Sequence, residues 1–261
     1  MSRPGSSDSE PRTHHPDDPL GAAVWRLRSR GCWEDAAALL APRATTDAAV
    51  ALQRSVVLTE RCVFTSAGWH AAEDALRAAE ALAVTDEERG AAACERGYLA
   101  YASTLFGTRD RADEARAALG RAAALLPPGS AVRPRLDFRR GLIAQHLGGD
   151  AAGAQAAFQR AHAAAAAGGD ALLRSSTWRH LAAMAERAGD TAQARHGFAE
   201  SLRIREELGY LIGIAPALAA LAAVEPEPDA SRLRAEAARL VRLLGGVPAW
   251  LAERLTAPEN G

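Results

Sequence analysis

The chain has 261 residues, a formal net charge of −1, 48% hydrophobic residues and only 5% aromatic residues. The balanced charge argues against a nucleic-acid surface, and no apolar run approaches the roughly 20 residues needed to cross a bilayer. We therefore expect a cytoplasmic protein with neither nucleic acid nor membrane as a partner. The apolar residues are mostly Ala and Leu, which favour helices over strands, so the composition predicts an all-α protein.

All 31 basic residues are Arg. They are spread along the chain, so we attribute them to a GC-rich genome rather than to a recognition surface for carboxylate or phosphate. The three cysteines, Cys32, Cys62 and Cys94, are odd in number and widely spaced, which fits neither a disulfide framework nor a zinc site. Each lies in an apolar helical stretch, so we expect small buried side chains, with a reactive thiol as the alternative.

Residues 1–19 are rich in Pro, Ser, Asp and His and lack a hydrophobic segment, so we expect a disordered tail rather than a signal peptide. Gly, Pro and capping residues then divide the chain into helices; Thr85 and Glu88, for example, have capping-box spacing. The predicted helices cover residues 20–30, 33–40, 46–65, 69–84, 87–106, 112–126, 134–147, 151–167, 171–188, 191–208, 211–224, 230–244 and 248–255.

These helices predict one repeat domain over residues 20–256. Its antiparallel pairs are expected at residues 20–43, 46–84, 87–126, 134–167, 171–208 and 211–244. A capping helix at 248–255 and a short tail at 257–261 complete the prediction.

Small residues recur at a nearly fixed interval: Ala36, Ala75, Ala115, Ala154 and Ala194 are 39, 40, 39 and 40 residues apart. Four positions after each, on the same helix face, stand Leu40, Ala79, Leu119, Phe158 and Phe198. A small residue lets two helices approach closely, and the residue one turn later can pack across to the neighbouring helix. A period in this range is typical of helix pairs stacked into a superhelical solenoid.

The fifth unit carries the clearest repeat pattern. Trp178, Leu181, Ala194 and Phe198 stand at the W, L, A and F positions of W-x2-L-G-x2-Y…A-x3-F, so the unit resembles the tetratricopeptide repeat (TPR) family. The Gly and Tyr of that pattern are replaced by Ala182 and Ala185. The resemblance covers about residues 20–245 and is strongest in units three to five. The period near 40, against the usual 34, is similar to a lengthened variant found in bacterial regulatory and scaffold proteins.

The resemblance implies a concave surface, lined by the first helix of each pair, where partners dock. In this chain it predicts a groove for a protein or peptide at Tyr101, Thr104, Arg135, Phe138, Gln145, His146, Ser176, Arg179, Glu186 and Arg187. Tyr101 and Phe138 can instead belong to the core, and the charged members to an ordinary solvated face. Trp178 is expected in the core.

The arginines of this region suggest an acidic peptide, because Arg binds carboxylates in bidentate fashion. They are Arg135, Arg139, Arg140 and Arg179. The clamp of Lys and Asn that the family uses for carboxylates is absent, since the chain has no Lys and its single Asn is Asn260.

The sequence contains no G-x-S-x-G, no Gly-rich phosphate loop and no pair of zinc-binding histidines at i, i+4 with an intervening Glu. We therefore expect no catalytic residues, no cofactor and no metal, although a triad built from distant residues stays open. The interpretation is a non-enzymatic protein- or peptide-binding scaffold in bacterial regulation. The alternative is a sensory module that binds a small ligand or signalling peptide, because roughly residues 171–245, with phrases such as residues 201–209, loosely resemble the C-terminal regions of bacterial transcriptional activators.

Overall fold

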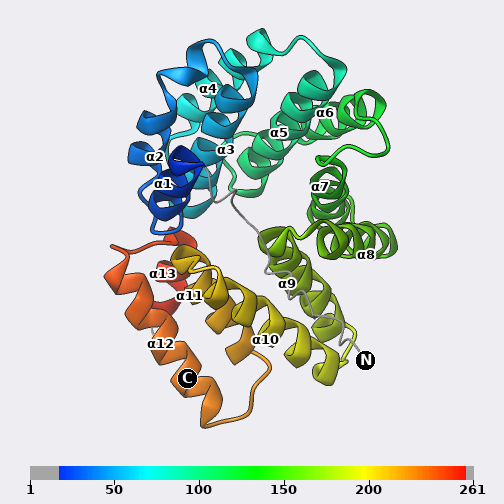
Figure 1. Cartoon of the computed structure of the whole chain (residues 1–261). Coiled ribbons are helices and arrows are strands. Elements are labelled where there is room, and N and C mark those ends of the chain that lie inside the picture. The colour runs from blue at the N-terminus through cyan, green and yellow to red at the C-terminus, as the bar shows by residue number, and fades with distance from the viewer. Residues whose placement is uncertain (1–17, 257–261) are drawn as a thin grey trace, which may run out of the picture.

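The structure is a computed structural model in which residues 18–256 are described (Figure 1). Its helices are α1 (Pro19–Arg28), α2 (Trp33–Leu40), α3 (Ala48–Thr65), α4 (Trp69–Leu82), α5 (Asp86–Leu105), α6 (Ala112–Leu125), α7 (Arg133–His146), α8 (Ala151–Gly168), α9 (Ala171–Arg187), α10 (Thr191–Glu207), α11 (Leu211–Ala222), α12 (Asp229–Leu243) and α13 (Ala249–Thr256). No strand occurs between residues 18 and 256, so the prediction of an all-α protein is confirmed. The tails predicted at 1–19 and 257–261 lie, apart from residues 18 and 19, outside the described residues.

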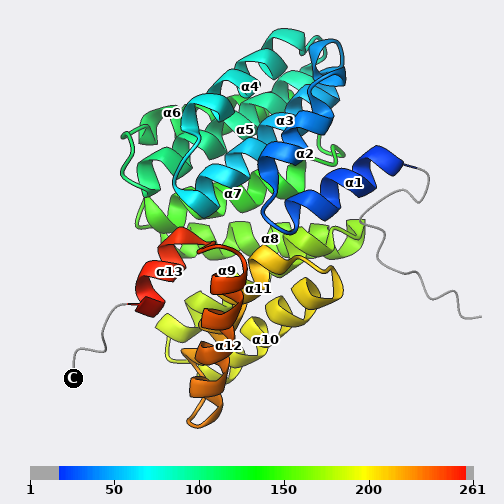
Figure 2. The same cartoon turned by 90° about the vertical axis from the view of Figure 1, so that its left-hand side faces the viewer.

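Consecutive helices pack as antiparallel pairs, and the pairs follow one another around a superhelix (Figures 1 and 2). The helices occur in the predicted order, with ends shifted by one or two residues. The sequence did not predict the short 3₁₀ helix η1 (Arg43–Thr45), which follows Pro42. The capping box at the start of α5 is present: the Thr85 hydroxyl accepts from the Glu88 N–H at 3.2 Å, and the Glu88 carboxylate accepts from the Thr85 N–H at 2.9 Å.

Helices α8, α9 and α10 begin with the same dipeptide, Gly-Asp. The glycines, Gly149, Gly169 and Gly189, have φ of +62°, +72° and +81°, a left-handed conformation that favours Gly. The aspartates, Asp150, Asp170 and Asp190, accept hydrogen bonds from backbone N–H groups of the first helical turn. Three successive helices thus begin with the same capped turn.

The regularly spaced alanines lie in the interior of the array. Ala36, Ala115, Ala154 and Ala194 are 0% exposed and Ala75 is 2% exposed. Their partners Leu40, Ala79, Leu119, Phe158 and Phe198 are also buried. The spacing therefore marks the places where the helices of a pair approach closely.

The Phe158 ring of α8 packs directly on the backbone of Gly141 in α7, and this contact brings the two helices together. A Cβ at Gly141 would lie 2.6 Å from a ring carbon of Phe158, closer than two carbon atoms can approach. Phe158 itself is 0% exposed. The separation of α7 and α8 thus depends on the absence of a side chain at Gly141.

The two ends of the superhelix meet. The Ile212 N–H at the start of α11 donates to the Ser29 carbonyl at the end of α1, at 3.1 Å. Tyr210 and Ile212 share a buried cluster with Val24 and Trp33 near the N-terminus. The concave surface therefore faces the centre of a closed ring, whereas the resemblance implies an open groove.

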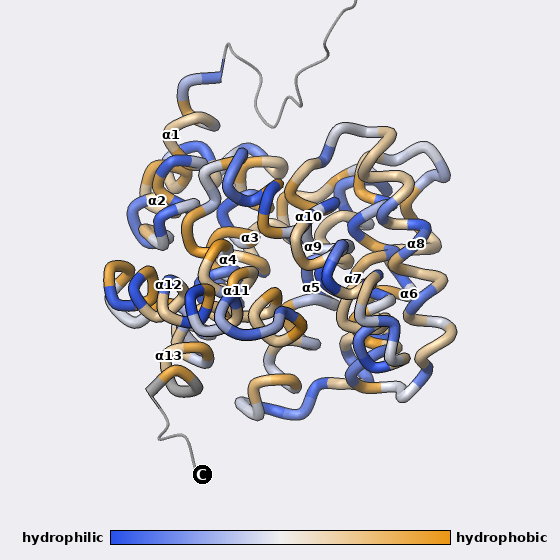
Figure 3. Tube along the Cα trace, turned by 90° about the horizontal axis from the view of Figure 1, so that it is seen from below, coloured by the Kyte–Doolittle hydropathy of each residue, from blue (hydrophilic) through white to orange (hydrophobic). Residues whose placement is uncertain are grey.

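Figure 3 shows hydrophobic and hydrophilic residues alternating along the helices, as expected where each helix buries one face. Within residues 18–256, none of the helices combines the length and the apolar character that crossing a bilayer requires.

Candidate functional site

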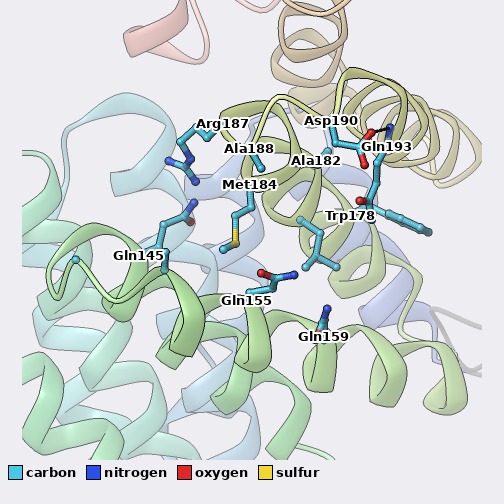
Figure 4. Close-up of a pocket in the computed structure, with 14 residues that line it drawn as sticks. Gln145, Gln155, Gln159, Trp178, Ala182, Met184, Arg187, Ala188, Asp190 and Gln193 are labelled. Carbon is cyan, nitrogen blue, oxygen red and sulfur yellow. Dashed lines mark hydrogen bonds between the residues drawn. The ribbon is translucent and has the colours of Figure 1, made fainter.

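A groove of about 610 Å³ lies between α8 and α9 and extends to the end of α7 and the start of α10 (Figure 4). Small side chains leave this space open. Its walls include Ala151 on α8 and Ala182, Ala185 and Ala188 on or just after α9. The alanine-rich composition that brings the helices together elsewhere thus leaves a hollow between these two.

Glutamine side chains are concentrated in this groove. The whole chain has five glutamines, and Gln145, Gln155, Gln159 and Gln193 all line it. The fifth, Gln53, is on α3. Gln155 and Gln159 are one turn apart on α8 and face α9 across the groove (Figure 4). The groove therefore holds nearly all the side-chain amides of the protein.

Three of these amides are free to bind a ligand. Gln155, Gln159 and Gln193 are exposed, and within the described part of the chain their side chains make no hydrogen bond. Each amide offers two N–H donors and a carbonyl acceptor. Gln145 is engaged: its Oε1 lies 2.9 Å from Nδ1 of His180, which donates to it. The walls thus offer amides that can both donate and accept.

An apolar strip from α9 forms the floor between the amides. It consists of Trp178, Leu181 and Met184, which are each half-buried. The Trp178 ring is held edge-on between His162, at 4.6 Å, and His196, at 5.3 Å. The sequence predicted Trp178 as a core residue; the structure leaves it partly open to the groove.

The end of the groove that holds Gln145 carries the positive charge of the Arg187 side chain (Figure 4). Burial and the charges of Arg187 and Arg179 lower the pKa of His146. Burial and Arg179 lower the pKa of His180 well below its usual value, so both imidazoles are neutral near pH 7. Neutral His146 accepts the Tyr101 hydroxyl at Nδ1, at 2.5 Å.

The structure brings together part of the predicted groove. Gln145 and Arg187 line the hollow. His146 follows Gln145 in the chain, contacts the Tyr101 hydroxyl, and has its pKa lowered in part by the charge of Arg179. Tyr101 is only 4% exposed, so it lies below the surface and contacts His146 rather than a ligand. Sequence reasoning did not single out Gln155, Gln159, Gln193 or Met184. The i, i+4 spacing of the first two was visible, but the helix opposite them was not.

Three of the predicted groove residues make contacts within the fold instead: Phe138, Ser176 and Thr104. Phe138 packs against Phe158, with ring centroids 5.6 Å apart. The Ser176 hydroxyl donates to the Leu172 carbonyl of its own helix at 3.1 Å. The Thr104 hydroxyl accepts from the Arg111 N–H at 2.8 Å and shapes the turn after α5.

The charged candidates divide into free and paired groups. Arg135 is exposed, and the surrounding protein, then the charge of Arg139, lowers the pKa of its guanidinium. Glu186 is exposed at the end of α9. Arg139 is buried, pairs with the Glu95 carboxylate and stacks over the Tyr98 ring at 4.6 Å. Arg139 is therefore not available to an acidic partner.

Comparison with known proteins gives likenesses in structure but none in sequence. No protein-family model matches the chain, and no curated protein matches it in sequence. The crystal structure of BtubC (BKLC) from P. vanneervenii is similar over 94% of each chain, with a TM-score of 0.50 and 17% identity. At this identity the likeness is one of fold: both chains are helical.

Proposed function

We propose that this protein is a non-enzymatic scaffold of the TPR type, acting in bacterial regulation, which binds an extended peptide segment of a partner in the groove between α8 and α9. The observation that carries the proposal is the gathering of four of the five glutamines around the apolar strip Trp178, Leu181 and Met184.

Amides suit an extended peptide because a main chain presents both N–H and C=O groups that must keep hydrogen-bond partners when they leave water. Gln155 and Gln159 are about 6 Å apart along α8, near the spacing of alternate residues in an extended chain, roughly 6.6 Å. The two amides can therefore form hydrogen bonds with peptide groups that are two residues apart in the bound peptide. The apolar strip receives side chains from the other face of the peptide.

A small ligand is the second candidate. The groove volume of about 610 Å³ lies within the range of small-molecule sites, roughly 300–1,000 Å³. The same amides and the Trp178 ring can hold a polar organic molecule. The experiment below separates the two candidates.

The test is selection of a displayed library of random peptides on the immobilised protein. Synthetic copies of the enriched peptides are then titrated against the wild type and against a variant with Gln155→Ala and Gln159→Ala. With about 1 kcal/mol for each lost hydrogen bond, we expect the affinity to fall by at least tenfold. Gln53→Ala removes the glutamine outside the groove and should leave affinity unchanged. Failure to enrich any peptide that depends on Gln155 and Gln159 contradicts the proposal, and stabilisation by metabolites instead favours the small ligand.

A further inference from the structure

Arg187 stands at one end of the groove without a carboxylate partner. It occupies the last turn of α9, is exposed, and points from that helix beside Gln145 (Figure 4). Within residues 18–256 its side chain makes no ion pair or hydrogen bond. The residues three and four positions before it are Met184 and Ala183, so its own helix supplies no acid one turn away.

Several exposed arginines of this chain are paired with carboxylates of their own helices. Arg203 contacts the Glu200 carboxylate at 2.9 Å, and Arg239 contacts that of Glu236 at 2.7 Å. Arg187 forms no such pair within α9, and its guanidinium borders the hollow.

The groove has opposite charges at its two ends. Gln145 and Arg187 stand at one end, while Asp190 stands near Gln193 and Trp178 at the other (Figure 4). The Asp190 carboxylate accepts from the Gln193 N–H at 3.0 Å, a hydrogen bond that leaves its negative charge in place. The positive charge of the groove therefore lies at the Arg187 end and its negative charge at the Asp190 end, so an acidic group of a ligand is attracted to Arg187.

We propose that the peptide bound in this groove presents a carboxylate to Arg187, so that it lies in one direction with its acidic end beside Arg187 and Gln145. This inference rests on the proposed function. A guanidinium and a carboxylate form paired hydrogen bonds that a neutral amide cannot reproduce. The apolar strip lies next to this contact, so the ligand is a segment with apolar residues beside an acidic group.

A cation in the last helical turn also interacts favourably with the helix dipole, whatever the ligand. Arg242 provides the matched control for that effect. It too is an exposed arginine in the last turn of a helix, α12, and it is outside the groove. Charge reversal at Arg242 changes the dipole interaction and leaves the groove intact.

The experiment is the same library selection carried out on the wild type, on Arg187→Glu and on Arg242→Glu. The inference predicts Asp, Glu or a free C-terminus at one fixed position of the wild-type peptides, and Lys or Arg at that position with Arg187→Glu. Selection on Arg242→Glu should return the wild-type preference. A wild-type peptide should bind Arg187→Glu about tenfold or more weakly, and the peptide with its acid changed to Lys should recover that loss.

Two further peptides identify the source of the carboxylate. Amidation of the C-terminus weakens binding if the group is the chain terminus, whereas Asp→Asn or Glu→Gln in the peptide weakens it if the group is a side chain. Peptides that need Gln155 and Gln159 but show no acidic preference, and no change with Arg187→Glu, overturn this inference and leave the peptide groove standing. Absence of any groove-dependent peptide overturns both.

Discussion

The Glu60 carboxylate accepts a hydrogen bond from the Tyr210 hydroxyl, 150 residues further along the chain, and this contact holds the ring closed. Glu60 also accepts from Arg28 at 2.5 Å and from the Trp33 indole N–H at 3.1 Å. Burial and the charge of Glu60 raise the pKa of Tyr210 well above its usual value, so the hydroxyl remains a donor. One carboxylate therefore connects α1, α2 and α3 with the turn before α11.

Glu60→Gln tests this closing contact. The substitution leaves the Arg28 guanidinium, whose side chain is 24% exposed, without its counter-charge. We expect the free energy of unfolding to fall by about 3 kcal/mol, the lower part of the range for breaking a buried pair. The control is Glu34→Gln, which breaks an ion pair with Arg61 in which Glu34 is 73% exposed and should cost less than about 1 kcal/mol. Equal losses in urea unfolding would remove the special role of Glu60.

Two glycine substitutions should change stability in opposite directions. Gly141→Ala puts a Cβ 2.6 Å from the Phe158 ring, so we expect a loss of about 1–3 kcal/mol from overpacking. Gly120→Ala, inside α6, meets no atom within 4 Å and should stabilise by about 0.5–1 kcal/mol, since Ala favours helix over Gly. Thermal unfolding measures both. A neutral Gly141→Ala would show that α7 and α8 can separate.

Acid should destabilise the protein through its neutral histidines. Burial, then the charge of Arg179, lowers the pKa of His180, with smaller effects of His146, Arg205 and Arg187. Below about pH 6.5 His180 therefore binds a proton in the unfolded chain but stays neutral in the folded chain. The free energy of unfolding is thus highest above about pH 6.5 and decreases as the pH falls toward the pKa of His180 in the folded protein.

His180→Phe should flatten this dependence. It keeps a ring in contact with Phe158, whose centroid lies 4.9 Å from that of His180, and removes the titration. The measurement is the free energy of unfolding from pH 7.5 to pH 5. The same slope for wild type and variant would mean that His180 is not the group that resists protonation.

The cysteines should differ in reactivity. Burial raises the pKa of Cys62 to about 12, so its thiol stays protonated at pH 8, and Cys94 is buried against the Arg139 guanidinium at 3.3 Å. Cys32 is only half-buried. Iodoacetamide should label Cys32 first in the folded protein and all three in urea, as mass spectrometry of peptides can show. Early labelling of Cys62 would contradict its burial.

The sequence predicted the features of the fold that depend on residues close together in the chain. The regular alanines and the Gly and Pro breaks determine where helices begin, end and approach their partners, and these features are local. The contact between Glu60 and Tyr210 depends on the rotation from each helix pair to the next. These small rotations add up along the chain, and no single stretch of sequence reveals their sum. The glutamines were missed for the same reason, because Gln145, Gln155 and Gln193 belong to three different helices.

The methionines allow the most direct test of the peptide groove. The chain has two, Met1 and Met184, and Met184 lies on the groove floor between the glutamines. Protein labelled with ¹³C at the methionine methyl groups therefore gives two signals, which Met184→Leu assigns. Titration with a peptide selected on the wild type should shift the Met184 signal to saturation and leave the Met1 signal in place. An unchanged Met184 signal at saturating peptide would show that the peptide binds elsewhere.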